Sequence, residues 1–206
     1  NHLLRDAILC SKPNPRYAYS APSYKQAKAV AWDYLKQFAG AVPMVRFHET
    51  ELRCDLPNGA RIQLLGAENP DSLRGIYLDG ACLDEMADMP ESLFPEIIRP
   101  ALSDRKGWAL FIGTPRGHNA FYELYSAAEG QDEWFPRTYQ ATQTGIVDAE
   151  ELQAPGYMLS AAQDSPAHAH SRLATLAAPV SRHQTAALSN RHTHTLLPYA
   201  PPPAAT

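Results

Sequence analysis

Short apolar runs alternate with stretches of helical spacing along most of the chain. Residues 23–38 place apolar side chains three and four positions apart, and Ser23 is suited to cap the start of such a helix. The apolar run of residues 108–115 predicts a buried strand, because a strand covered on both faces lacks alternating polar positions. The same patterns predict strands at residues 16–22, 44–49, 51–56, 60–66 and 133–142 and within 75–89, and helices at residues 1–10, 89–103 and 117–130. This alternation predicts an α/β fold with a doubly wound, mostly parallel sheet.

The composition changes after residue 152. Residues 153–206 are dominated by Ala, Pro, Ser, Thr and His, and they contain no Lys, Glu, Phe or Trp. A segment without sustained periodicity or bulky apolar side chains cannot bury enough surface to offset its chain entropy. We therefore expect one α/β domain at residues 1–152 and a low-complexity, disordered tail at residues 153–206. The abrupt change also suggests the hypothesis of a reading-frame change near Leu152.

The overall composition narrows the class of protein. Apolar residues make up 45% of the 206 residues, which is enough for a real core. The formal net charge is -4, so the whole surface is not basic, although a local basic patch can lie on a weakly acidic protein. Cys10, Cys54 and Cys82 form no C-x-x-C pair, and we expect them to be small core residues. No run approaches the roughly 18 apolar residues of a membrane span, and the first residues show no signal-peptide pattern.

The stretch Gly75–Met89, GIYLDGACLDEMADM, leads an apolar strand directly into two acids, Asp84 and Glu85. Charges beside a core are costly unless they are paired, bound to metal or used in chemistry. The pattern has the form of the Walker B motif of P-loop ATPases, whose first acid holds magnesium and whose second polarises the attacking water. Open α/β sheets also bind ligands at the carboxyl ends of their strands. A strand that ends in a solvated turn gives the same pattern, so both interpretations stay open at this point.

A wider set of motifs resembles the ATPase domain of the large terminase subunit of tailed bacteriophages, the motor and nuclease that packages viral DNA. The motifs are ARIQLLGAENPDSLRGIYLDGACLDEMADM, followed by IIRPALSDRKGWALFIGTPRGHNAFYELY, in the order and spacing of that family. YAYSAPSYKQAKAVAWDYLK is similar to the family's segment after its phosphate-binding helix. The resemblance covers residues 1–152 and implies a P-loop NTPase-like fold.

The resemblance implies roles for four residues. Asp84 corresponds to the acid that coordinates magnesium, and Glu85 to the catalytic acid. Thr114, in the Gly-Thr-Pro turn, falls on the coupling motif that senses the nucleotide and relays its state to DNA movement. Arg74 matches the arginine that, in some members, reaches into the ATP site of a neighbouring subunit. The competing interpretations are a surface arginine in a turn for Arg74 and a simple turn after a strand for Thr114.

Two features of the family are absent from this sequence. The phosphate-binding run G-x-x-x-x-G-K-[ST] does not occur, and in the family it lies just before the helix that NHLLRDAIL resembles. We therefore expect the chain to begin inside the ATPase domain. The tail contains a single acid, Asp164, whereas the family's nuclease site uses clustered acids and two metals. We accordingly expect no DNA cleavage by this chain.

For the intact family, the resemblance implies ATP and Mg2+ as cofactors. It implies double-stranded DNA, a small terminase subunit, a portal protein and further copies in a ring as partners, no membrane, and the cytoplasm of the bacterial host as the location. The leading interpretation is a fragment of a viral DNA-packaging motor. Another P-loop motor such as a helicase, or an inactive prophage remnant, remains an alternative, and whether this chain itself hydrolyses ATP stays open.

Overall fold

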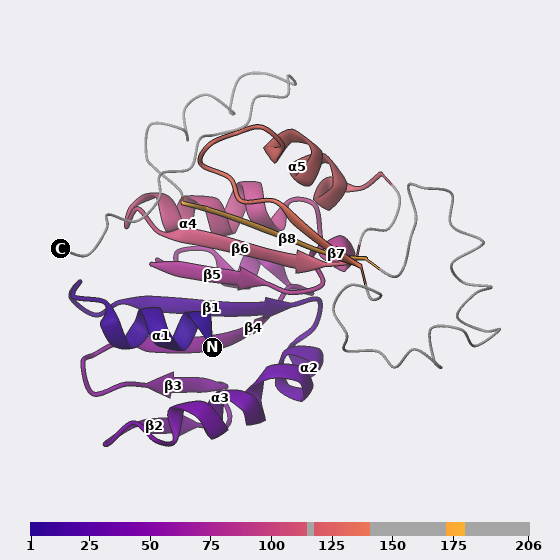
Figure 1. Cartoon of the computed structure of the whole chain (residues 1–206). Helices are drawn as coiled ribbons and strands as arrows, with labels where there is room; N and C mark the ends of the chain where they lie inside the picture. Colours follow the sequence, from indigo (N-terminus) through magenta and orange to yellow (C-terminus); the bar gives the residue numbers. More distant parts are fainter. Residues whose placement is uncertain (115–117, 141–171, 180–206) are drawn as a thin grey trace.

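The computed structural model describes residues 1–114, 118–140 and 172–179, and of the last segment only the backbone (Figure 1). In chain order its elements are α1 (His2–Leu9), β1 (Arg16–Ala21), α2 (Tyr24–Ala27), η1 (Lys28–Trp32), α3 (Asp33–Ala39), β2 (Arg46–His48), β3 (Arg53–Asp55), β4 (Arg61–Gly66), η2 (Pro70–Leu73), β5 (Gly80–Leu83), η3 (Met86–Asp88), η4 (Leu93–Ile98), α4 (Arg99–Ser103), β6 (Trp108–Gly113), α5 (Ala120–Ala128), β7 (Arg137–Gln140) and β8 (Arg172–Pro179). None of the described helices combines the length and the apolar character that a membrane span requires.

The strands form one eight-stranded sheet in the order β2-β3-β4-β1-β5-β6-β8-β7. Its four central strands, β4, β1, β5 and β6, pair in parallel. β2 and β3 extend the sheet on one side in antiparallel fashion, and β8 lies antiparallel between β6 and β7 on the other. The helix-covered parallel centre confirms the predicted α/β class, and the two flanks make the sheet mixed.

The helices of the first 40 residues cover one face of the sheet. Ala7 of α1 and Ala39 of α3 are fully buried against Tyr17 and Ile62 of the central strands. The α2–η1–α3 helix begins as predicted, because the Ser23 hydroxyl accepts a hydrogen bond from the backbone N–H of residue 26 at 3.2 Å. This layer lies over β1, β4 and β3, whereas α4 and α5 lie at the β6 half of the molecule (Figure 1).

The opposite face of β1, β5 and β6 carries the larger core. Phe111 of β6 is fully buried there and meets Phe94 of η4 edge to face, with 4.7 Å between the ring centroids. Burying a side chain of this size contributes about 1.5–3 kcal/mol. The predicted broken helix of residues 89–103 is confirmed as η4 continuing into α4, and the chain carries a proline in each part.

A buried carboxylate joins the amino ends of β1, β5 and β6. Asp79, 3% exposed, accepts hydrogen bonds from the backbone N–H of Arg16 at 2.9 Å and from Arg105, and pairs with Lys12 at 3.1 Å. Burial alone would raise the pKa of Asp79, but Arg105, the Arg16 amide and Lys12 together lower it below its ordinary value. These contacts fix the strands at one end and so help to align their carboxyl ends.

Residues 172–179 depart from the expectation of a disordered tail. They form β8, whose backbone pairs with β6 from Trp108 opposite Pro179 to Gly113 opposite Ala174. A strand at the edge of a sheet presents unpaired N–H and C=O groups, and these can pair with a segment that has no core of its own. The compositional argument treated the tail as an isolated chain and therefore missed this pairing. The remainder of residues 153–206, and the domain boundary predicted at residue 152, lie outside the described residues.

Candidate functional site

Three of the predicted site residues lie at one edge of the sheet. Asp84 and Glu85 follow β5 directly, and Thr114 follows β6. The two strands pair in parallel, with Leu83 opposite Phe111, so they end at the same edge. Open α/β sheets bind their ligands at this carboxyl edge. A position of the two acids on the opposite rim from Thr114, which would have excluded a shared site, is not observed.

Both carboxylate oxygens of Asp84 accept hydrogen bonds. The hydroxyl of Tyr19, on the neighbouring strand β1, donates to Oδ2 at 2.5 Å, and the backbone N–H of Glu85 donates to Oδ1 at 3.1 Å. Burial, this hydrogen bond and the charge of Asp84 raise the pKa of Tyr19 above its ordinary value, so the phenol stays protonated. The two hydrogen bonds hold Asp84 in one orientation. Each oxygen of an ionised carboxylate has a second acceptor position, and this position remains available for a cation.

Glu85 has a left-handed backbone conformation, with φ 56° and ψ 44°. For a residue other than glycine this conformation costs on the order of 1 kcal/mol or more, and such strain is concentrated at functional sites. The carbonyl of Glu85 accepts a hydrogen bond from the N–H of Asp88 at 2.9 Å, which closes the short helix η3. The strained residue therefore begins a tight turn at the strand end.

The end of β6 packs closely against this turn. A Cβ atom on Gly113 would lie 3.3 Å from the backbone nitrogen of Met86 and 3.3 Å from the ring of Phe121. A larger residue at Gly113 would have to push the turn away. The glycine therefore keeps Thr114, the next residue, beside the turn that carries Glu85.

Arg74 is held by carboxylates of its own chain. Its guanidinium pairs with Asp71 at 2.8 Å and with Glu96 of η4 at 3.3 Å, and its side chain is about half exposed, at 53%. The hydrogen bonds to Asp71 and Glu96 raise the pKa of Arg74 above its ordinary value. The structure brings Asp84, Glu85 and Thr114 to one strand edge, and it places Arg74 in ion pairs with carboxylates of η2 and η4.

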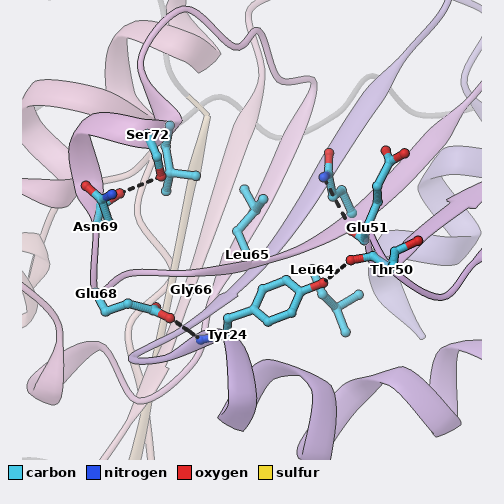
Figure 2. A pocket seen from close by; sticks show the side chains of 11 residues that line it. Tyr24, Thr50, Glu51, Leu64, Leu65, Gly66, Glu68, Asn69 and Ser72 are labelled. Atoms are coloured by element: carbon cyan, nitrogen blue, oxygen red, sulfur yellow. Dashed lines mark hydrogen bonds between the residues drawn. The ribbon is translucent and has the colours of Figure 1, made fainter.

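A hollow of about 350 Å³ lies beside the start of α2 (Figure 2). There the Glu68 carboxylate accepts the backbone N–H of Tyr24 at 2.9 and 3.0 Å, and the Tyr24 hydroxyl donates to the carbonyl of Thr50 at 2.8 Å. Gly66 makes room for this contact, because a Cβ atom there would lie 1.9 Å from Glu68 Oε2. The start of a helix attracts anions, and Glu68 already occupies this one. The phosphates of a nucleotide are therefore not expected at this helix.

Three residues that support the site were missed by the sequence analysis. Tyr19 holds Asp84, Glu68 ties the loop after β4 to α2, and Asn119 links α5 to the η3 turn by donating to the carbonyl of Ala87 at 3.3 Å. An asparagine before an apolar helical pattern is a recognisable cap signal, and the Asn119 side chain does cap α5. The other two depend on pairing between distant segments, for which the sequence carries no local signal.

The donors at this edge suit magnesium bound together with phosphates better than a metal bound by protein alone. The described residues contain no group of three or more His, Cys, Asp or Glu side chains that could hold a metal ion. Magnesium typically keeps several waters and binds through one or two carboxylates plus substrate phosphates, and Asp84 supplies one such carboxylate. Burial, with a smaller effect of the Asp84 charge, raises the pKa of the nearby Cys82 thiol to about 12.

Comparison with known protein families decides the lineage. The family described as "Terminase large subunit, T4likevirus-type, N-terminal" matches residues 5–181, which is most of the chain. The chain belongs to the terminase large subunit family. This membership confirms the resemblance inferred from the motifs, and it does not favour the alternatives of another P-loop motor such as a helicase or an inactive prophage remnant. The range that matches the terminase family includes all four predicted site residues and β8.

Individual relatives match shorter parts of the terminase chain. The large terminase subunit of Thermus phage G20c is 54% identical over 59 residues, which are 29% of this chain and 12% of that protein. The large terminase subunit of Escherichia phage T5 is 32% identical over 129 residues, 61% of this chain and 29% of that protein. Among solved structures, the large terminase ATPase domain of Thermus phage P74-26 is 30% identical and has a TM-score of 0.49, with 60% of this chain and 57% of that chain covered. The chain therefore spans less than a third of the length of these two curated relatives.

Proposed function

We propose that this terminase chain supplies the magnesium-binding and water-activating side of an ATP-hydrolysing site, in a motor that moves double-stranded DNA into a procapsid. The observation that carries the proposal is the shared position of Asp84, Glu85 and Thr114 at the carboxyl edge of adjacent parallel strands, in a chain of the terminase family. This edge is where the fold class binds its ligands.

Each residue has a distinct task in the proposed site. Asp84 binds magnesium through the acceptor positions that Tyr19 and the Glu85 amide leave open. Bound magnesium neutralises charge that develops on the transferring phosphoryl group. Glu85 accepts a hydrogen bond from the attacking water and orients it. Thr114 follows β6 at the same edge, where a hydroxyl can report whether the terminal phosphate is present.

Arg74 is proposed to act on the nucleotide of a neighbouring copy in a ring. Its guanidinium is half exposed and has a fixed charge and a planar fork, which suit the stabilisation of charge on a phosphoryl group. In this structure its partners are Asp71 and Glu96, so engagement with a neighbour requires that it exchange these two contacts. The two ion pairs hold the Arg74 side chain in place within its own subunit.

The partners of the motor follow from the family and are part of the proposal. They are double-stranded DNA, a small terminase subunit, a portal protein and further copies of the chain, and the place of action is the cytoplasm of the bacterial host. The sequence contains no G-x-x-x-x-G-K-[ST] run to hold phosphates, so we expect weak ATP binding by the chain on its own.

The two acids can be separated experimentally by measuring ATP binding calorimetrically with and without Mg2+, together with phosphate release. Asp84→Asn is expected to lower the affinity for Mg2+–ATP by about tenfold or more and to leave magnesium-free ATP binding unchanged. Glu85→Gln is expected to abolish phosphate release while Mg2+–ATP affinity stays within about twofold, because water activation occurs only in the reaction.

Asp132→Asn is the matched control, because it removes the same charge from the exposed turn between α5 and β7 rather than from the β5 strand end. An equal loss of binding and turnover in Glu85→Gln would contradict the role given to Glu85. A chain that neither binds nor hydrolyses ATP would show that the site does not work in this protein.

A further inference from the structure

A row of arginines crosses the sheet face that the α1–α3 layer leaves open. The strand register places Arg46 of β2, Asp55 of β3, Arg61 of β4 and Arg16 of β1 directly opposite one another. Residues paired in this way share one face of the sheet. The residues between them, such as Ile62, are buried on the other face under α1 and α3. We call Arg16, Arg46, Arg53 and Arg61 the arginine row.

Asp55 organises the centre of this row. Its carboxylate contacts Arg61 Nε at 2.8 Å, Arg53 Nε at 3.3 Å and His48 Nε2 at 3.1 Å. Burial alone would raise the pKa of Asp55, but the hydrogen bond from Arg61 and the nearby cations lower it below its ordinary value. One carboxylate therefore orients two arginines, Arg53 and Arg61, and cannot neutralise both.

The arginine row carries a surplus of positive charge on an acidic molecule. Its four arginines face two carboxylates, Asp55 and Glu51, whereas the whole chain has a net charge of -4. Arg46 is exposed and forms no ion pair recorded within the described part of the chain. A hollow of about 230 Å³ lies at the β1–β4 end of the row, where Arg16 and Arg61 form part of its lining.

The positive charge continues past β1 at the same amino end of the sheet. The guanidinium groups of Arg16 and Arg105 lie 5.7 and 5.2 Å from the centre of the Tyr77 ring, and Lys12 joins them at Asp79. The carboxyl end of the same face has the opposite character, because Glu51 and Glu68 line the hollow there (Figure 2). A polyanion would therefore lie along the amino end only.

We propose that the arginine row is a contact surface for the phosphate backbone of duplex DNA. This inference rests on the proposed function in one respect, which is that the polyanion is taken to be nucleic acid. The row spans three steps between strands, about 14 Å in all, and is comparable with the roughly 12 Å width of a major groove. Arg46 and Arg16, at its ends, can therefore contact phosphates on both sides of one groove.

The chemistry of the surface favours a duplex over single-stranded nucleic acid. Surfaces for single strands combine cations with exposed aromatic rings on which bases stack. The residues that strands β2, β3 and β4 add to this face are arginine, histidine, aspartate, glutamine and leucine. Where the described surface continues past β1 it adds one exposed aromatic ring, Tyr77, which already lies against Arg16 and Arg105, so this surface offers no series of free rings for successive bases. Arginine contacts to phosphate bind without reading sequence, as expected for a protein that moves along DNA.

The test measures binding of a short fluorescent duplex by anisotropy across a salt series beginning at about 50 mM. The unsubstituted chain is expected to lose affinity linearly with the logarithm of the salt concentration. Arg46→Gln should make the slope shallower by about 0.9, and the double variant Arg46→Gln with Arg61→Gln by about twice that amount. Arg46 is exposed, so the single variant remains informative if loss of Arg61 disturbs folding.

Arg5→Gln is the matched control, because it removes one exposed arginine from α1 on the other side of the sheet and should leave the salt slope unchanged. The proposal is overturned if the row variants keep the slope of the parent chain, if the control changes it equally, if single strands bind more tightly than the duplex, or if the parent chain binds no DNA. Because Asp84 and Glu85 lie at the opposite edge, Mg2+–ATP binding reports separately on the proposed function.

Discussion

Asp84 is held by two neighbours of different origin, a side chain from β1 and the amide of the next residue. The Tyr19 hydroxyl is the more specific of the two, because it comes from a segment 65 positions away in the sequence. A hydrogen bond to a charged group contributes more than one between neutral groups. Tyr19 therefore couples the stability of the central sheet to the orientation of the proposed magnesium ligand.

Removal of the Tyr19 hydroxyl should destabilise the fold measurably. Tyr19→Phe keeps the ring and deletes the donor to Asp84, so we expect urea denaturation to show a loss of about 1.5–3 kcal/mol in the free energy of unfolding. Tyr34→Phe makes the same chemical change at a ring that is 64% exposed and should stay within about 0.5 kcal/mol of the parent chain. Equal effects of the two substitutions would show that the Tyr19–Asp84 bond carries little energy.

At the residue scale, the sequence predicts which residues carry the chemical groups of the site better than it predicts which residues they contact. The apolar run before Asp84 and Glu85 predicted correctly that both follow a buried strand, since periodicity reports burial. The Arg74–Glu96 ion pair and the hydrogen bond from Tyr19 could not be predicted, because each joins segments whose relative position is set by the whole fold. The roles of the four site residues remain proposals that the experiments address.

Among the elements, β8 is the one that local pattern could not reveal. The strands from β1 to β7 were all predicted, and β7 ends the sheet. Their signals are local runs of apolar or β-branched residues. β8 pairs with β6, more than 50 residues earlier in the chain, and it lies in a low-complexity stretch without sustained periodicity. Its strand conformation depends on a partner that is already folded.

Deletion of β8 should therefore expose the edge of β6. A chain that ends at Ser171 loses the strand that separates β6 from β7, and an unprotected edge is a template for pairing with another chain. We expect concentration-dependent self-association in sedimentation velocity experiments. A chain that ends at Val180 keeps β8 and serves as the control. If both chains remain monomeric and melt at the same temperature, the β6–β8 pairing contributes nothing to the protein in solution.

Across the whole molecule, two surfaces of opposite character lie at opposite ends of the parallel strands. The carboxyl edge carries Asp84, Glu85 and Thr114. The amino end carries Asp79 and Arg16, the member of the arginine row that lies on β1. The proposed motor function requires a nucleotide site and a polyanion contact that are joined by rigid structure. The central strands β1 and β5 supply a direct connection between the two ends.

The central claim is that Asp84 binds the metal of a nucleotide at this carboxyl edge. The most direct measurement is electron–nuclear double resonance of bound Mn2+, which replaces Mg2+, with ADP and a chain that contains 13C-labelled aspartate. Our account predicts a 13C coupling from one carboxylate that disappears in Asp84→Asn and persists in Asp132→Asn. A coupling that survives in Asp84→Asn, or that is absent from the unsubstituted chain with ADP and Mn2+ bound, would contradict it.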